Sequence, residues 1–107
     1  SAFSDGNVGG NPAGVLIAEE LPDAATMQRI AADVGYSETA FAAPGEHGWR
    51  VRYFSPLAEV PFCGHATIAL GAALARAQGD GVFPLQLNQA RISVQGWRDG
   101  DQLRAAL

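Results

Sequence analysis

Residues 65–78 read HATIALGAALARAQ, and their only charged side chain is Arg76. A helix formed by this stretch is apolar around nearly its whole circumference, so protein has to cover it on most sides. Its many alanines add little bulk, which allows neighbouring strands to approach closely. We therefore expect a central buried helix from His65 to Gln78, around which the rest of the chain is arranged.

The segments before and after this helix alternate apolar with polar residues, as half-buried strands do. Before it, residues 49–53 (WRVRY) alternate strictly, and residues 37–43 (SETAFAA) show the same tendency. After it, favourable hairpin turns at residues 88–89 and 99–100 separate three short alternating segments: Phe83–Leu87, Ile92–Val94 and Leu103–Ala105. The pattern predicts mainly antiparallel strands on both sides of the helix.

A second helix is predicted between Asp23 and Gly35. Asp23 is a suitable N-cap, and Gly35 stands where a C-cap glycine is expected. Between them, apolar residues recur at helical spacing: Met27, Ile30, Ala31 and Val34. This helix is amphipathic and should pack by one side only.

Residues 4–12 (SDGNVGGNP) are rich in glycine and asparagine, which favour tight turns. We expect a loop here, between a short strand at residues 2–3 and a strand at residues 14–18. The glycine spacing differs from that of a dinucleotide-binding loop, and a strand rather than a helix follows it. A phosphate-binding loop is therefore not expected.

Together these elements predict an α+β fold. A strongly curved, mainly antiparallel, barrel-like sheet should wrap around the central buried helix, with the amphipathic helix outside the sheet. The chain has 107 residues, enough for one hydrophobic core, so residues 1–107 should form a single domain.

The composition excludes several classes of function. Asp and Glu number 11 against 7 Lys and Arg, without a basic cluster, which argues against a nucleic-acid partner. No apolar run has the length of a membrane span, and the first residues lack the features of a secretory signal. The single cysteine cannot form an internal disulfide, and no metal-ligand spacing is visible. We expect a cytoplasmic protein without a metal and without membrane contact.

Five residues at the start of the central helix could carry chemistry: Cys63, Gly64, His65, Ala66 and Thr67. The first turn of a helix presents unpaired N–H groups and a partial positive charge, so it can bind a carboxylate or phosphate. A thiol placed there is expected to have a lowered pKa. The spacing leaves other interpretations open, because Thr67 can cap the helix, Cys63 can be a small buried hydrophobe and His65 can be structural.

Glu38 is the second candidate, because it lies in a predicted strand otherwise made of Ser, Thr, Ala and Phe. A buried carboxyl group holds its proton more tightly than an exposed one, so it can act as a proton shuttle. The alternative is an exposed charge on an edge strand that discourages aggregation. Glu59 can equally be a solvated loop charge.

Five motifs in this order resemble the phenazine biosynthesis PhzF isomerase/epimerase-like family. They are GNPAGV at residues 10–15, MQ-IA at residues 27–31, SETAF at residues 37–41, RYFSP at residues 52–56 and EVPFCGHAT at residues 59–67. The resemblance implies a fold like that of diaminopimelate epimerase. In that fold, two similar halves each wrap a curved sheet around a central helix, and the active site lies between them.

The resemblance also implies roles for individual residues. Glu38 would be the general acid/base that moves a proton between carbons, without a cofactor or metal. Cys63 would be a second candidate shuttle, because related cofactor-independent epimerases use a cysteine at this place. The residues implied to contact a substrate with a carboxylate are Asn11, Gly64, His65, Ala66 and Thr67.

Members of the family are longer, and this chain resembles only their first half. A half-cleft leaves apolar surface uncovered, and two copies related by a two-fold axis could rebuild the cleft. We therefore expect a homodimer that binds a small carboxylate and, as an isomerase or epimerase, transfers a proton. The alternatives are a non-catalytic module that binds small anions, or a truncated half that is inactive or pairs with a separate second half.

Overall fold

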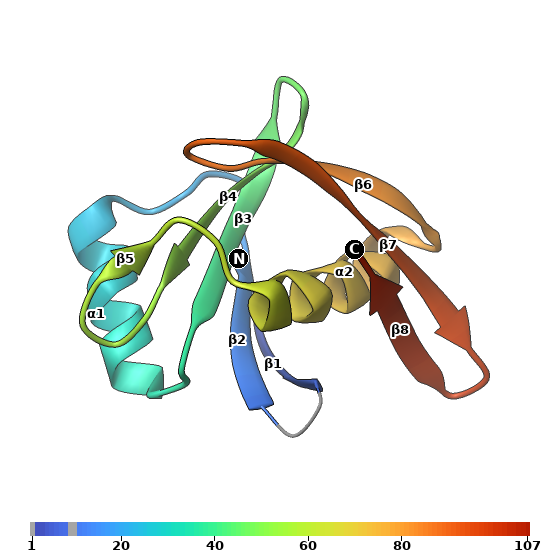
Figure 1. The fold of residues 1–107 in the computed structure, drawn as a ribbon, viewed down its shortest axis with the longest axis horizontal. Coiled ribbons are helices and arrows are strands. Elements are labelled where there is room, and N and C mark those ends of the chain that lie inside the picture. Colours follow the sequence, from blue (N-terminus) through green and yellow to red (C-terminus); the bar gives the residue numbers. More distant parts are fainter. Residues whose placement is uncertain (1, 9–10) are drawn as a thin grey trace.

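One curved sheet bends around a helix and carries a second helix on its outer side (Figure 1). The computed structural model describes residues 2–8 and 11–107, with side chains from residue 13 onward. The helices are α1 (Ala24–Val34) and α2 (Gly64–Gln78). The strands are β1 (Ala2–Val8), β2 (Asn11–Ile17), β3 (Thr39–Gly45), β4 (Gly48–Phe54), β5 (Glu59–Val60), β6 (Gly81–Gln86), β7 (Arg91–Asp99) and β8 (Gln102–Ala106).

The strands are ordered β1-β2-β3-β4-β6-β7-β8, and β5 pairs with β4 beside this path. Two contacts are parallel, β2 with β3 and β4 with β6, and the other pairings are antiparallel. The sheet curls around α2 in Figure 1. These features confirm the predicted α+β class and the curved, mainly antiparallel sheet around a central helix.

The two faces of the sheet bury two separate apolar clusters. On the concave face, α2 packs Leu70 and Leu74 against strand residues such as Val51 and Tyr53. On the convex face, α1 packs Met27 and Ala31 with three residues of the sheet, Leu16, Phe41 and Phe54. Because side chains alternate along a strand, β4 contributes to both clusters from consecutive positions.

The ends of α1 confirm the predicted capping residues. The Asp23 carboxylate accepts a hydrogen bond from the backbone N–H of Thr26 at 2.8 Å. At the other end Gly35 adopts φ 75°, a left-handed conformation in which glycine has no steric penalty, and its N–H donates to the Ala31 carbonyl. The residue types at positions 23 and 35 were enough to predict both ends of α1, because capping depends on residues within one turn.

Three details differ from the expectations. Strands β1 and β2 occupy most of the predicted loop 4–12 and pair as far as Val8 with Asn11, because backbone pairing requires no particular side chains. Strand β3 begins at Thr39 rather than at residue 37, and its first five residues are buried on both faces. Helix α2 is buried along one side, whereas Ile68 and Ala72 are only half-buried.

Two glycines bring α2 into close contact with β7. A Cβ atom on Gly96 would lie 2.3 Å from the Gly71 carbonyl oxygen and 3.0 Å from the Ala75 Cβ. A Cβ atom on Gly71 would lie 2.6 Å from a methyl group of Val94. The small residues of α2 predicted a close approach between this helix and the strands. That approach depends on Gly71 in the helix and on Gly96 in β7.

We expect Gly96→Ala to lower the free energy of unfolding by about 1–3 kcal/mol, because the added methyl would overlap backbone atoms that cannot move independently. Gly81→Ala is a matched control. Gly81 pairs with Gly96 on the neighbouring strand, and the nearest atom to its added Cβ is 3.7 Å away. Equilibrium urea unfolding measures both; equal losses for the two variants would contradict the proposed close contact.

Candidate active site

The end of β4 brings together the two segments that carry the candidate proton shuttles. Phe54, the last residue of β4, pairs with Thr39 of β3 on one side and with Glu59 of β5 on the other. Glu38 directly precedes Thr39, and Cys63 follows the short strand β5. Segments that are distant in sequence are thus placed at the same end of the sheet.

Glu38 lies on the concave side of the sheet. Its backbone carbonyl extends the β2–β3 pairing by accepting a hydrogen bond from the Gly14 N–H at 3.1 Å. The next residues with the same side-chain direction, Ala40 and Ala42, belong to the cluster around α2. The Glu38 carboxylate reaches the Cys63 thiol at the start of α2. The residue is half-buried, so it remains partly accessible to solvent.

Cys63 is the N-cap residue of α2 and contacts Glu38 directly. Its Sγ donates a hydrogen bond to Glu38 Oε1 at a distance of 3.3 Å. Among the residues whose side chains are described, none caps this end of the helix with a hydrogen bond. The two candidate shuttles of the sequence analysis therefore form one thiol–carboxylate pair at the N-terminus of the central helix.

The direction of the Cys63 pKa shift corrects the sequence-based expectation. Burial against the α2 cluster is the largest influence and raises the pKa of the Cys63 thiol above its ordinary value. The backbone N–H of Ala66 acts in the opposite direction, and the Glu38 carboxylate raises the pKa further. The expected lowering was wrong because the helix N–H groups do not outweigh desolvation and a neighbouring negative charge.

Two buried hydroxyl groups, those of Thr67 and Tyr53, support Cys63 through its backbone carbonyl group. The Thr67 hydroxyl donates to the Cys63 carbonyl oxygen at 2.8 Å, and Tyr53 Oη lies 2.7 Å from Thr67 Oγ1. Because the Thr67 proton is already used, Tyr53 is the donor in the second bond. Burial raises the pKa of Tyr53, so the phenol remains neutral and can donate.

The remaining predicted site residues fall into two groups. Gly64 is half-buried and His65 is exposed on the first turn of α2, next to the thiol–carboxylate pair. Ala66 and Thr67 are fully buried on the side of the helix that faces the sheet. Asn11 begins β2, but its side chain lies outside the described residues, so its role stays a prediction.

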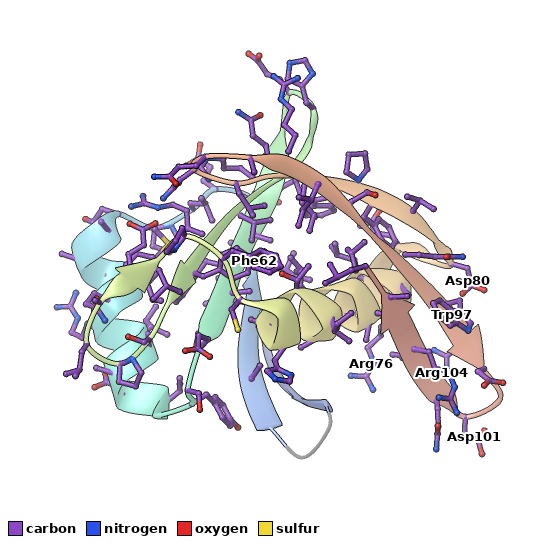
Figure 2. All side chains as sticks on the ribbon, viewed as in Figure 1. Phe62, Arg76, Asp80, Trp97, Asp101 and Arg104 are labelled. Carbon is purple, nitrogen blue, oxygen red and sulfur yellow. The ribbon has the colours of Figure 1, made fainter. Side chains whose placement is uncertain are left out.

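Three residues of this region were not recognised from the sequence. Tyr53 was placed in an alternating strand and given no role at the site, yet it supports Cys63 through Thr67 and packs edge-on against Phe62, with ring centroids 5.9 Å apart. Figure 2 shows Phe62 beside the start of α2. Gln28 of α1 donates to the carbonyl oxygens of residues 55 and 56 at 2.9 and 3.2 Å, which fixes the loop after β4. The inward position of Tyr53 in an alternating strand was the available signal.

Within the described part of the chain, no three His, Cys, Asp or Glu side chains come together as a metal site requires. Among the same residues, no helix combines the length and apolar character needed to cross a membrane.

Comparisons with known proteins agree on one family. Residues 1–99 match the model of the PhzC-PhzF family, described as phenazine biosynthesis-like proteins. YddE of Escherichia coli O157:H7, named an uncharacterized isomerase, is 38% identical over 104 residues, which cover 92% of this chain and 35% of YddE. An uncharacterized isomerase of Pseudomonas aeruginosa is 36% identical over 104 residues, covering 95% of this chain and 39% of that protein.

Solved structures show the same similarity. A predicted epimerase of Pseudomonas aeruginosa superposes with a TM-score of 0.82 at 27% identity, over 90% of this chain and 36% of that chain. A PhzF-family phenazine biosynthesis protein of Bacillus anthracis gives a TM-score of 0.74 at 30% identity, over 94% and 36% of the two chains. The chain thus spans about a third of the length of the relatives it matches. By its sequence motifs, its fold and these matches, the chain belongs to the phenazine biosynthesis-like PhzC-PhzF family.

Proposed function

We propose that this chain forms one wall of a PhzF-like isomerase or epimerase site that transfers a proton on a small carboxylate without a cofactor. The observation that carries the proposal is the hydrogen bond between Cys63 Sγ and Glu38 Oε1 at the N-terminus of α2. A proton donor and a proton acceptor in contact, beside a helix end that favours anions, are the parts that such a reaction needs.

Glu38 is the first proton shuttle in this proposal. Its carboxylate removes a proton from a substrate carbon, and the electron pair left behind is delocalised into the adjoining unsaturated or carboxylate group. The protonated Glu38 then returns the proton to another carbon of the same substrate, which completes an isomerisation. Proton and charge balance without any further reactant.

Cys63 supplies the second route. Its raised pKa keeps the thiol protonated near neutral pH, so it starts as a donor rather than a nucleophile. Glu38 and Cys63 touch each other on one wall, so inversion at a carbon needs a proton donor on the opposite wall. If Glu38 removes the proton from one face of the carbon and Cys63 of a second copy protonates the other face, the product is the epimer, and proton exchange with water restores both groups. The N-terminal N–H groups of α2 would hold the substrate carboxylate, with Gly64 and His65 beside it.

A second copy of the chain would complete the cleft. Ile68 and Ala72 leave part of α2 only half-covered, and Phe62 keeps 46% of its surface exposed beside the same helix. Pairing of two copies about a two-fold axis would bury this apolar surface and exclude water from the thiol–carboxylate pair. The proposed assembly is therefore a homodimer with the site between the subunits.

We expect Glu38→Gln to slow exchange of substrate C–H for deuterium by roughly 100-fold or more, because the amide cannot accept the proton. The measurement is NMR signal loss in D2O across a panel of cyclic and amino-acid carboxylates with acidic C–H bonds. Glu46→Gln, in the exposed turn between β3 and β4, is the control. Exchange at the wild-type rate in Glu38→Gln would refute the role of Glu38, and no exchange with any panel member would favour a non-catalytic binding module.

Alkylation of Cys63 by iodoacetamide should be slow at pH 7 and should accelerate as the pH rises, because the thiol pKa is raised. Removing the negative charge in Glu38→Gln lowers that pKa, so we expect alkylation at pH 7 to be roughly three- to tenfold faster. Glu46→Gln should leave the rate unchanged. A slower or unchanged rate in Glu38→Gln would contradict the direct contact between thiol and carboxylate.

Light scattering of the purified chain at tens of micromolar should give twice the monomer mass. Ile68→Glu places a charge in the proposed interface, so it should shift the mass towards monomer. Val82→Glu, at a position of β6 that is 63% exposed, serves as the control and should not. A wild-type protein that is entirely monomeric would rule out the homodimer.

A further inference from the structure

A two-pronged ion pair joins β4 to the segment that leads into α2. Arg52 Nε donates to Glu59 Oε2, and Arg52 Nη2 donates to Glu59 Oε1, both at 2.8 Å. The Arg52 guanidinium also lies over the ring of Phe54, 5.6 Å from its centroid. This fork fixes the orientation of both side chains as well as their distance.

Neighbouring polar groups extend the contact to the β6–β7 turn. Asn88 Nδ2 donates to Glu59 Oε2 at 2.8 Å, and the Asn88 side-chain oxygen accepts a hydrogen bond from Arg50. Arg50 also donates to the Gln86 carbonyl oxygen at 3.3 Å. Glu59 is therefore not the solvated loop charge that the sequence allowed, because partners on β4 and on the β6–β7 turn hold it.

Residues 59–63, which lead into α2, are also held by side chains on the opposite face of β4. Tyr53, the residue after Arg52, packs its ring against Phe62, and its hydroxyl reaches the Cys63 carbonyl through Thr67. Residues 59–63 are thus attached at both ends by consecutive side chains of one strand. Pro61 lies between the attachments and restricts the backbone further.

We propose that the Arg52–Glu59 pair is a positioning element, which holds the Cys63 thiol against Glu38. A two-residue strand such as β5 has few backbone hydrogen bonds of its own, so it needs side-chain support to keep one position. Both partners are about one quarter exposed, at 25% and 26%, and their two parallel hydrogen bonds hold them in one relative orientation. The fork is therefore suited to setting the position of Cys63, four residues after Glu59.

The inference rests on the proposed function for its use in proton transfer, but its test does not require turnover. The rate of Cys63 alkylation is compared with and without Glu38→Gln, first in the wild type and then in Glu59→Ala. The ratio of the two rates reports the coupling between thiol and carboxylate. Because each ratio compares two proteins with the same residue at position 59, this double-mutant cycle removes the direct effect of the Glu59 charge on the Cys63 thiol.

We expect a ratio of roughly three to ten in the wild type and less than about twofold in Glu59→Ala, because the thiol no longer stays beside Glu38. Asp99→Ala is the matched control. It breaks another arginine–carboxylate pair, more exposed and with a single hydrogen bond, in which Arg104 Nε donates to Asp99 Oδ2 at 2.6 Å on the β7–β8 hairpin. Figure 2 shows Arg104 on that hairpin, away from Phe62. The control should keep the wild-type ratio.

A wild-type ratio that persists in Glu59→Ala would overturn the proposal. An equal loss in Asp99→Ala would also overturn it, because general loosening would then explain the result. Circular dichroism verifies folding. If Glu59→Ala is unfolded, Glu59→Gln carries the same test, since it keeps the shape of the side chain and loses half of the fork. If the ratio of alkylation rates depends on Glu59 but no compound of the panel exchanges deuterium, the proposed function is rejected and the positioning role stands.

Discussion

The double pairing of Phe54 is the constraint on which the candidate site depends. One residue at the end of β4 aligns Thr39 on one neighbour and Glu59 on the other. Glu38 and Cys63 are 25 positions apart in sequence, yet they meet at 3.3 Å because each is attached to one of these neighbours. Backbone hydrogen bonds set the register, and side chains adjust the final distance.

Alternation along β4 divides its side chains between two tasks. Residues directed to the concave face, such as Tyr53, pack against α2 and support the start of that helix. Residues directed to the convex face, such as Arg52, lie beside the cluster under α1 and hold the connection to β5. The site is therefore supported by both layers of the fold, although its chemical groups lie on the concave side.

Local signals explain how much of the fold was predictable. Helix α1 has its cap residues and apolar periodicity within its own length, and the final hairpins have their turn residues between alternating segments. The glycine-rich segment was misassigned, because strand pairing between β1 and β2 overrides the turn preference of single residues. Glu38 and Cys63 were recognised as candidates one at a time, but their contact could not be, since it depends on a register between three strands.

By itself the sequence determined the class of the fold, the helix at its centre and the family, and it singled out Glu38 and Cys63 as candidates for proton transfer. Each of these follows from residue type and spacing, which are local properties. The tertiary structure alone decided that the thiol donates to the carboxylate, that burial makes its pKa higher rather than lower, and that Glu59 is held by Arg52. These are properties of distance and desolvation, and they exist only once separate segments are packed together.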